Sequence, residues 1–283
     1  MLLLAVALVL VVGADVVHAQ PAVESRVETV WIAMTEKRLL GSSRTLRLEA
    51  TLYRPGASGA APLLVFNHGS TGRGRGSPTE TLTYAETARF FVERGWAVLI
   101  PMRRGRGASD GEYLERYECE SPALSSGLDR AIEDLDAVMA FVGQQAWVDR
   151  SRLLLGGMSR GGFLSIVYTS LRDTGAKGVI NFAGGWTADA CDQRIHFHEP
   201  TLARAGRSSS LPELWLYSEN DRNYGPAAVH AYHRAFTGAG GTAELHLFPP
   251  IGHDGHILLP RSVAVWSSAV AEYLRRIGLG DRG

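Results

Sequence analysis

Short apolar runs alternate with amphipathic segments along most of the chain. Arg44–Tyr53 alternates leucine with polar residues, as a half-buried strand does, and Val27–Met34 before it is predicted as its partner strand. Short, nearly continuous apolar runs are typical of buried parallel strands. Six of them follow along the chain: Leu63–Phe66, Ala97–Ile100, Leu153–Leu155, Val179–Phe182, Leu214–Tyr217 and Leu245–Phe248.

Segments with helical spacing separate these runs. Leu128–Val142, for example, places apolar side chains at intervals of three and four residues. The predicted helices are Tyr84–Glu93, Leu128–Val142, Phe163–Leu171, Ala227–Phe236 and Val263–Ile277. The alternation predicts an α/β fold with a mostly parallel central sheet, helices on both faces and antiparallel strands at the N-terminus. Ligands of such sheets bind where the parallel strands end, so the loops that follow strands carry the candidate chemistry.

The first nineteen residues differ from the rest. An apolar run, Leu2–Val12, is too short to cross a bilayer comfortably, and Val17-His18-Ala19 offers small residues for cleavage before Gln20. We therefore predict a signal peptide at 1–19, secretion or periplasmic export, and one catalytic domain at 20–283. No Lys or Arg precedes the apolar run, so an uncleaved anchor or a misplaced start site remains the alternative.

Composition narrows the class of partner. The chain has 283 residues, 45% of them hydrophobic, which is enough for one sizeable core. Its 29 basic residues balance its 29 acidic residues. Because a neutral chain has no global field to attract nucleic acid or an anionic membrane, we expect a small-molecule partner. The sequence does not indicate an oligomeric state.

Two cysteines, Cys119 and Cys191, can form one disulfide in an oxidising compartment or remain as two thiols. They lack the spacing of a structural zinc site, and no metal or organic cofactor is implied. His196 and His198, and His230 and His233, are expected at the surface rather than on a metal. Residues 187–210 have no clean period and are predicted as a lid or insertion over the site, or as a plain surface loop.

The pattern Gly-x-Ser-x-Gly occurs twice, at Gly157-Met158-Ser159-Arg160-Gly161 and at Gly107-Ala108-Ser109-Asp110-Gly111. A nucleophile elbow needs a strand running directly into the serine and a helix leaving it. Leu153–Leu155 leads into the first match and Phe163–Leu171 follows it, whereas Ser109 has no helix-forming run directly after it. Ser159 is therefore the predicted nucleophile.

A serine hydroxyl needs a base, and the expected chain order is serine, acid, histidine. Asp221 follows the strand Leu214–Tyr217 by a short loop and is the predicted acid, with Glu219 and Asp192 as rivals. For the base, His256 is preferred over His253 because it has Gly before it and an apolar run after it, at the mouth of the last helix.

The developing oxyanion needs preorganised donors. One is expected from the backbone N–H of Arg160, directly after the nucleophile. The second is expected from the Asn67–Gly72 loop, where Gly69 lets the backbone turn its amides inward, and the N–H of Ser70 is preferred. His68 is expected to be structural in that turn.

In these motifs the chain resembles the α/β-hydrolase superfamily, and especially its dienelactone-hydrolase-like and prolyl-oligopeptidase-like branch. The resemblance spans about Thr45–Ile277. The segments that carry it are Asn67-His68-Gly69, Arg104–Gly111, Gly157–Gly162, Ser218–Asp221 and Pro249–His256. It implies the α/β-hydrolase fold and supports His256, since related hydrolases often carry the base in a Gly-His step. Dienelactone hydrolases proper use a cysteine nucleophile, and prolyl-oligopeptidase-type peptidases usually carry an N-terminal propeller for which this chain has no room.

The leading functional hypothesis is hydrolysis of small carboxylic esters through an acyl-enzyme on Ser159, and an exported peptidase or amidase is the alternative. A non-catalytic binding protein on this fold is the third class. Several arginines fall on the loops after strands, and Arg104 and Arg106 are the predicted substrate ligands for an anionic acyl group. The other members of the set are Arg73, Arg75, Arg103 and Arg160. Arginines that instead hold loop backbones or point to solvent are the alternative.

Overall fold

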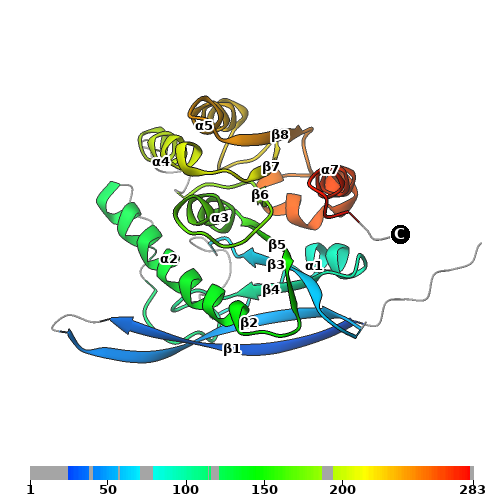
Figure 1. Cartoon of the computed structure of the whole chain (residues 1–283). Coiled ribbons are helices and arrows are strands. Elements are labelled where there is room, and N and C mark those ends of the chain that lie inside the picture. Colours follow the sequence, from blue (N-terminus) through cyan, green and yellow to red (C-terminus); the bar gives the residue numbers. More distant parts are fainter. Residues whose placement is uncertain are drawn as a thin grey trace, which may run out of the picture.

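One eight-stranded sheet organises the computed structural model (Figure 1). The structure describes residues 25–37, 41–56, 58–70, 79–113, 115, 121–186 and 194–280, without the side chains of 121–123 and 194–196. The predicted signal peptide, Cys119, Cys191, Arg73, Arg75 and Asp192 lie outside these residues. The strands are β1 Ser25–Lys37, β2 Ser43–Pro55, β3 Ala61–Asn67, β4 Ala97–Pro101, β5 Val148–Met158, β6 Val179–Phe182, β7 Pro212–Ser218 and β8 Thr242–Phe248.

The strand order is β1-β2-β4-β3-β5-β6-β7-β8. Strand β2 is antiparallel to both of its neighbours, and every pair from β4–β3 to β7–β8 is parallel. The predicted mostly parallel sheet with antiparallel N-terminal strands is therefore confirmed. The central strands are fully buried, with Leu63–Phe66 at 0% exposure, because helices cover both faces.

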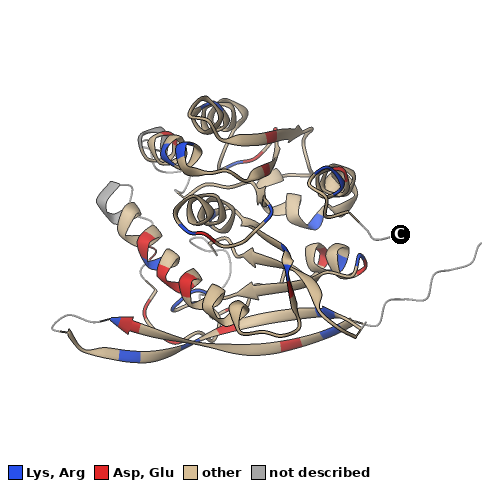
Figure 2. Cartoon of the chain, viewed as in Figure 1, with Lys and Arg blue, Asp and Glu red and all other residues tan. Residues whose placement is uncertain are grey.

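The helices are α1 Ala85–Val92, α2 Ser121–Gly143, α3 Arg160–Leu171, α4 Arg194–Ser208, α5 Pro226–Gly238, α6 Gly255–Leu258 and α7 Val263–Arg276, with a short 3₁₀ turn at Leu259–Arg261. Helices α1 and α7 lie together on one face, and α2, α3, α4 and α5 lie on the other (Figure 1). No helix among the described residues is long and apolar enough to cross a membrane. Acidic and basic residues are interspersed over α2, α7 and the β1–β2 ribbon (Figure 2), as the zero net charge leads one to expect.

The expected lid or loop at 187–210 is, over its described part, helix α4. Residues 187–193 lie outside the described residues. The helix buries Phe197, His198, Leu202 and Ala205 against α3 and α5, so a helical apolar face is present. The sequence pattern did not predict this helix because one of its buried residues is a histidine. Residues 194–208 therefore belong to the helices that cover one face of the sheet, and they are not a surface loop.

Glu213 at the start of β7 is a buried carboxyl with one hydrogen-bond donor. Trp215 Nε1 donates to its Oε2 at 2.6 Å, and Oε1 has no hydrogen-bond partner. Burial raises the pKa of Glu213 to about 8, and the Trp215 hydrogen bond only partly opposes this.

This raised pKa predicts a loss of stability as pH rises from 4.5 to about 8. Between pH 4.5, the ordinary glutamate pKa, and about 8, the folded chain keeps a proton that the unfolded chain releases. The free energy of unfolding therefore falls as pH rises through this window, by at most about 1.4 kcal/mol per pH unit. Glu213→Gln, which cannot ionise, is expected to flatten this dependence in urea titrations at pH 5, 7 and 9. The exposed Glu219→Gln serves as the control, and a pH dependence left unchanged by Glu213→Gln would contradict the assignment.

Candidate active site

Ser159 lies at a sharp turn between β5 and α3. Its backbone has φ 54° and ψ −121°, a strained conformation for a residue with a side chain. Glycines on either side allow the two elements to cross closely. A Cβ on Gly157 would lie 2.6 Å from the carbonyl carbon of Gly161, and a Cβ on either glycine would also lie too close to the carbonyl oxygen of Asn67 at the end of β3. The first Gly-x-Ser-x-Gly match is therefore the strand–turn–helix elbow that the sequence predicted.

The second match has a different structure. The hydroxyl of Ser109 donates to the carbonyl oxygen of Met102 at 2.7 Å and accepts the N–H of Glu49 at 2.9 Å. The first bond lies within the loop after β4, and the second ties this loop to strand β2. Ser109 is thus a structural residue.

The structure brings the three candidate side chains together. His256 Nε2 lies 3.0 Å from Ser159 Oγ, and His256 Nδ1 lies 2.9 Å from Asp221 Oδ2. An ionised carboxylate only accepts hydrogen bonds, so this contact assigns the proton to Nδ1 and leaves Nε2 to accept from the serine hydroxyl. All three residues are buried, at 4–6% exposure, so their contacts are shielded from solvent.

Asp221 is itself held by the backbone. Its Oδ1 accepts the N–H groups of Asn223 at 2.7 Å and Tyr224 at 2.8 Å, which leaves Oδ2 for the imidazole. The rival acid Glu219 is exposed at the end of β7. Asp221, rather than Glu219, therefore faces His256.

His256 lies in the four-residue helix α6, and Asp254 caps the N-terminus of that helix. Asp254 Oδ1 accepts the N–H of His256 at 3.0 Å and that of Arg222 at 3.4 Å. Asp254 is buried at 1% exposure, whereas His253 beside it is exposed. Asp254 was not among the predicted site residues, although an Asp two residues before a histidine at a helix start is a capping signal.

The turn after β3 packs directly on the nucleophile. A Cβ on Gly69 would lie 3.2 Å from Ser159 Cβ and 2.7 Å from Met158 Sδ. Ser70, the predicted second oxyanion donor, follows Gly69 directly. Arg160, the predicted first donor, opens helix α3 beside Ser159. Both predicted donors therefore belong to segments in contact with the nucleophile.

His68 is structural in this turn, as expected. Its Nε2 accepts the N–H of Arg103 at 3.1 Å, so its Nδ1 carries the proton and donates to the carbonyl oxygen of Gly69 at 2.6 Å. Burial, followed by the charge of Arg103, holds the pKa of His68 well below its usual range. A neutral, fully buried imidazole with both nitrogens engaged cannot serve as a proton carrier.

The structure contradicts the prediction that Arg104 binds substrate, and it buries Arg106 as well. The Arg104 side chain is 2% exposed and contacts three carboxylates, from Glu36, Glu133 and Asp134, at 2.5–3.1 Å. Arg106 is 3% exposed, and its guanidinium stacks on the ring of Tyr113 at 3.7 Å. Arg104 is buried because the loop after β4 folds back against β1, β2 and α2, where carboxylates from β1 and α2 neutralise its charge.

Two further arginines form a buried cluster with Glu115. Arg103 donates to both carboxylate oxygens of Glu115. Arg160 Nη1 lies 3.5 Å from Glu115 Oε2 and donates to the Glu115 carbonyl oxygen at 2.8 Å. Arg160 Nε also donates to the carbonyl oxygen of Trp186 at 2.9 Å. These side chains join two loops to the elbow and are not available to an anionic acyl group.

His198 corrects the expectation that the histidines of this region lie at the surface. It is fully buried, and its Nε2 accepts the N–H of Trp186 at 2.7 Å. In the same loop the N–H of Gly185 donates to the carbonyl oxygen of Ser159 at 3.2 Å. His198 therefore supports the loop that packs against the nucleophile.

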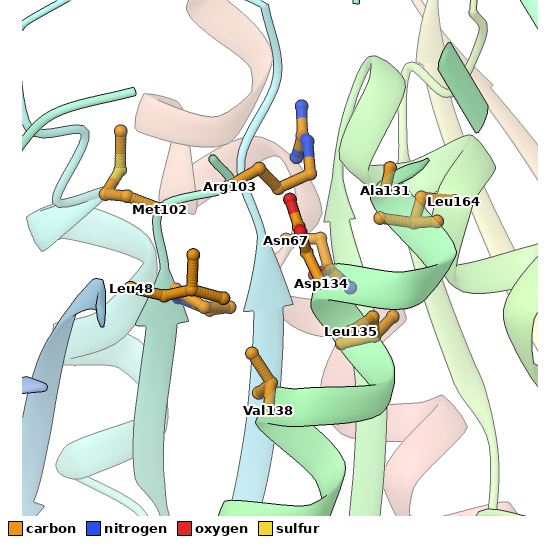
Figure 3. Close-up of a pocket in the computed structure, with 10 residues that line it drawn as sticks. Leu48, Asn67, Met102, Arg103, Ala131, Asp134, Leu135, Val138 and Leu164 are labelled. Atoms are coloured by element: carbon orange, nitrogen blue, oxygen red, sulfur yellow. The ribbon is translucent and has the colours of Figure 1, made fainter. Parts of the chain in front are cut away.

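A small cavity lies between the sheet and helices α2 and α3 (Figure 3). The volume open to the centre of a water molecule is about 10 Å³, which is enough for one water. Its polar lining residues are Asn67, Arg103 and Asp134, and its apolar ones include Leu48, Leu135 and Val138. Burial raises the pKa of Asp134 to about 6 against the opposing charge of Arg104. The cavity contains none of Ser159, Asp221 and His256 and is too small for an ester.

Among the described residues, no group of three or more His, Cys, Asp or Glu could hold a metal ion.

Comparison with known proteins identifies the relatives of this chain. The model of the dienelactone hydrolase family matches residues 50–256, which include all three candidate side chains. The chain belongs to the dienelactone hydrolase family.

Several solved structures are similar to this family member over most of its length. An esterase of Pyrococcus furiosus is 18% identical, with a TM-score of 0.62, over 94% of this chain and 96% of the esterase. An acylaminoacyl peptidase of Pyrococcus horikoshii is 16% identical, with a TM-score of 0.62, over 87% of this chain and 41% of the peptidase. These likenesses establish the α/β-hydrolase fold.

One curated relative matches part of the sequence. The quorum-quenching protein AidA of Acinetobacter baumannii is 27% identical over 139 residues, which are 49% of this chain and 40% of that protein. The chain thus matches less than half the length of this relative.

Proposed function

We propose that this member of the dienelactone hydrolase family hydrolyses carboxylic esters of small molecules through an acyl-enzyme on Ser159. The observation that carries the proposal is the hydrogen-bonded chain from Ser159 Oγ through His256 to Asp221, at 3.0 and 2.9 Å. A serine held this way has a base within reach of its proton, and the base has a partner that orients it. The esterase among its structural relatives supports the choice of substrate.

The proposed reaction has two halves. Ser159 Oγ attacks the ester carbonyl while His256 Nε2 takes its proton, and the N–H groups of Arg160 and Ser70 stabilise the oxyanion. Collapse of the tetrahedral intermediate breaks the bond to the alcohol, which leaves with the proton from His256. Water then attacks the acyl-enzyme by the same route, with His256 as base, and releases the acid and the free serine. Asp221 stays ionised and stabilises the imidazolium in both halves.

Covalent labelling with a fluorophosphonate tests the proposal. We expect one adduct on the folded chain, located on Ser159 by peptide mass mapping and lost in Ser159→Ala. Hydrolysis of p-nitrophenyl acetate and of the matched p-nitroanilide then separates an esterase from the alternative amidase or peptidase. A folded wild-type chain that neither labels nor hydrolyses either substrate would refute catalysis at this site. Labelling with turnover of the anilide but not the ester would move the assignment to the peptidase class.

A further inference from the structure

Backbone strain is concentrated around the nucleophile. Among the described residues, three that are not glycine have a left-handed φ: Tyr84 at 41°, Ser159 at 54° and Ala183 at 49°. Such conformations are unfavourable for a residue with a side chain and persist only where their surroundings hold them. Ser159 forms the elbow, and Ala183 opens the loop whose Gly185 N–H contacts Ser159. Tyr84 is far from both in sequence, so its strain needs an explanation of its own.

Tyr84 places its phenol oxygen on the turn that packs against Ser159. It precedes helix α1, and its ring packs on Phe66 at a centroid distance of 5.0 Å. From there its hydroxyl oxygen accepts the N–H of Gly69 at 2.9 Å. Gly69 is the residue whose Cβ, if it had one, would lie 3.2 Å from Ser159 Cβ. The strained backbone thus delivers a polar atom to the immediate surroundings of the nucleophile.

Gly69 is held at both of its ends. Its N–H donates to Tyr84, and its carbonyl oxygen accepts the Nδ1 proton of His68 at 2.6 Å. That carbonyl belongs to the same planar peptide group as the N–H of Ser70, and in a trans peptide the two point in opposite directions. Restraining Gly69 therefore also restrains the direction of the Ser70 N–H.

We propose that Tyr84 is a positioning residue of the oxyanion hole: it holds the N–H of Gly69, in the peptide group directly before Gly69–Ser70, and so keeps Gly69 placed such that the Ser70 N–H faces the acyl carbonyl oxygen. This inference rests on the proposed function, because it assigns a part of the same site. Without the phenol oxygen, the Gly69 N–H loses its partner and the turn can rotate away from Ser159. Displacement of a preorganised donor weakens stabilisation of the transition state more than it weakens substrate binding.

Tyr84→Phe removes only this hydroxyl, and Tyr168→Phe is the matched control. Tyr168, on helix α3, is buried, and its hydroxyl donates to Asp136 at 2.9 Å. For p-nitrophenyl acetate we expect Tyr84→Phe to lower kcat about 10- to 100-fold with KM within about twofold, because small displacements of catalytic groups cost this much. Tyr168→Phe is expected to keep the wild-type kcat, with Tm measured for both variants.

A second readout reports on the oxyanion hole itself. Thiocarbonyl sulfur accepts hydrogen bonds poorly, so a well-oriented donor accelerates an ester more than its thionoester. We expect Tyr84→Phe to reduce the ratio of ester to thionoester rates, a change that a loss of packing alone would not produce. An unchanged kcat, or a lowered kcat with the wild-type ratio, would overturn the proposal. If the wild type itself neither labels nor turns over, the proposed function fails instead, which is a distinguishable result.

Discussion

His256→Ala is expected to lower kcat for p-nitrophenyl acetate by about 10⁴- to 10⁶-fold, the usual cost of losing the base of such a triad. Among the described residues, the imidazole of His256 is the only side chain that forms a hydrogen bond with Ser159 Oγ, at a distance of 3.0 Å. Without it, the serine keeps its proton at neutral pH and attacks slowly. Rates with the ester, measured against the Ser159→Ala background, give the effect.

His253→Ala is the matched control for this prediction. His253 lies three residues earlier in the same Gly-His-Asp-Gly-His segment and is exposed. Its replacement is expected to change kcat by no more than about twofold, as for an ordinary surface substitution. Equal losses in the two variants would contradict the assignment of His256 as base, and a loss confined to His253→Ala would reverse it.

The parts of the fold that the sequence predicted are those governed by local pattern. All eight predicted strands are present, because a buried parallel strand leaves a short apolar run such as Leu153–Leu155, whose length and neighbouring glycines favour a strand over a helix. The predicted strands were too short: the run Leu153–Leu155 belongs to strand β5, which extends from Val148 to Met158. The elbow was predictable for the same reason, because its glycines and flanking elements are neighbours in sequence.

The parts that could not be predicted depend on partners distant in sequence. From its sequence neighbours, Arg104 is expected to be a free loop cation. In the structure it binds Glu36, which lies on a strand 68 residues earlier. His198 is expected to be a polar surface residue. In the structure Trp186 and Tyr232 form hydrogen bonds with its two ring nitrogens. Glu115 carries no motif at all. In each case the polar residue is buried because a partner from another element satisfies it.

Glu115 belongs to a set of buried polar residues next to the nucleophile. His68, Arg103, Glu115 and Arg160 form one continuous set of contacts that joins the elbow to the turn after β3. Catalytic geometry must be held to a fraction of an ångström, and loops alone do not provide such rigidity. The buried charges are therefore expected to contribute both to stability and to the placement of Ser159 and Gly69.

Glu115→Ala is expected to destabilise the fold by about 3–5 kcal/mol, because it leaves the buried guanidinium of Arg103 without its carboxylate and removes one of the contacts of Arg160. Although burial alone would raise it, the charges of Arg103 and Arg160 hold the pKa of Glu115 at about 2. A lowered folded-state pKa means that the stabilisation is complete above pH 4.5, the ordinary value, and is lost as pH falls toward about 2. Urea unfolding at pH 7 and at pH 3 measures both effects.

Glu272→Ala controls for the loss of an ion pair as such. Glu272 binds Arg275 on the surface of α7, with both side chains more than half exposed, and such pairs contribute little because water competes for both charges. We expect Glu115→Ala, but not Glu272→Ala, to lower the urea midpoint at pH 7 and to reduce the loss of stability between pH 7 and pH 3. Similar midpoints for the two variants would mean that the Arg103–Glu115–Arg160 cluster is not what holds the loop after β4 against the elbow.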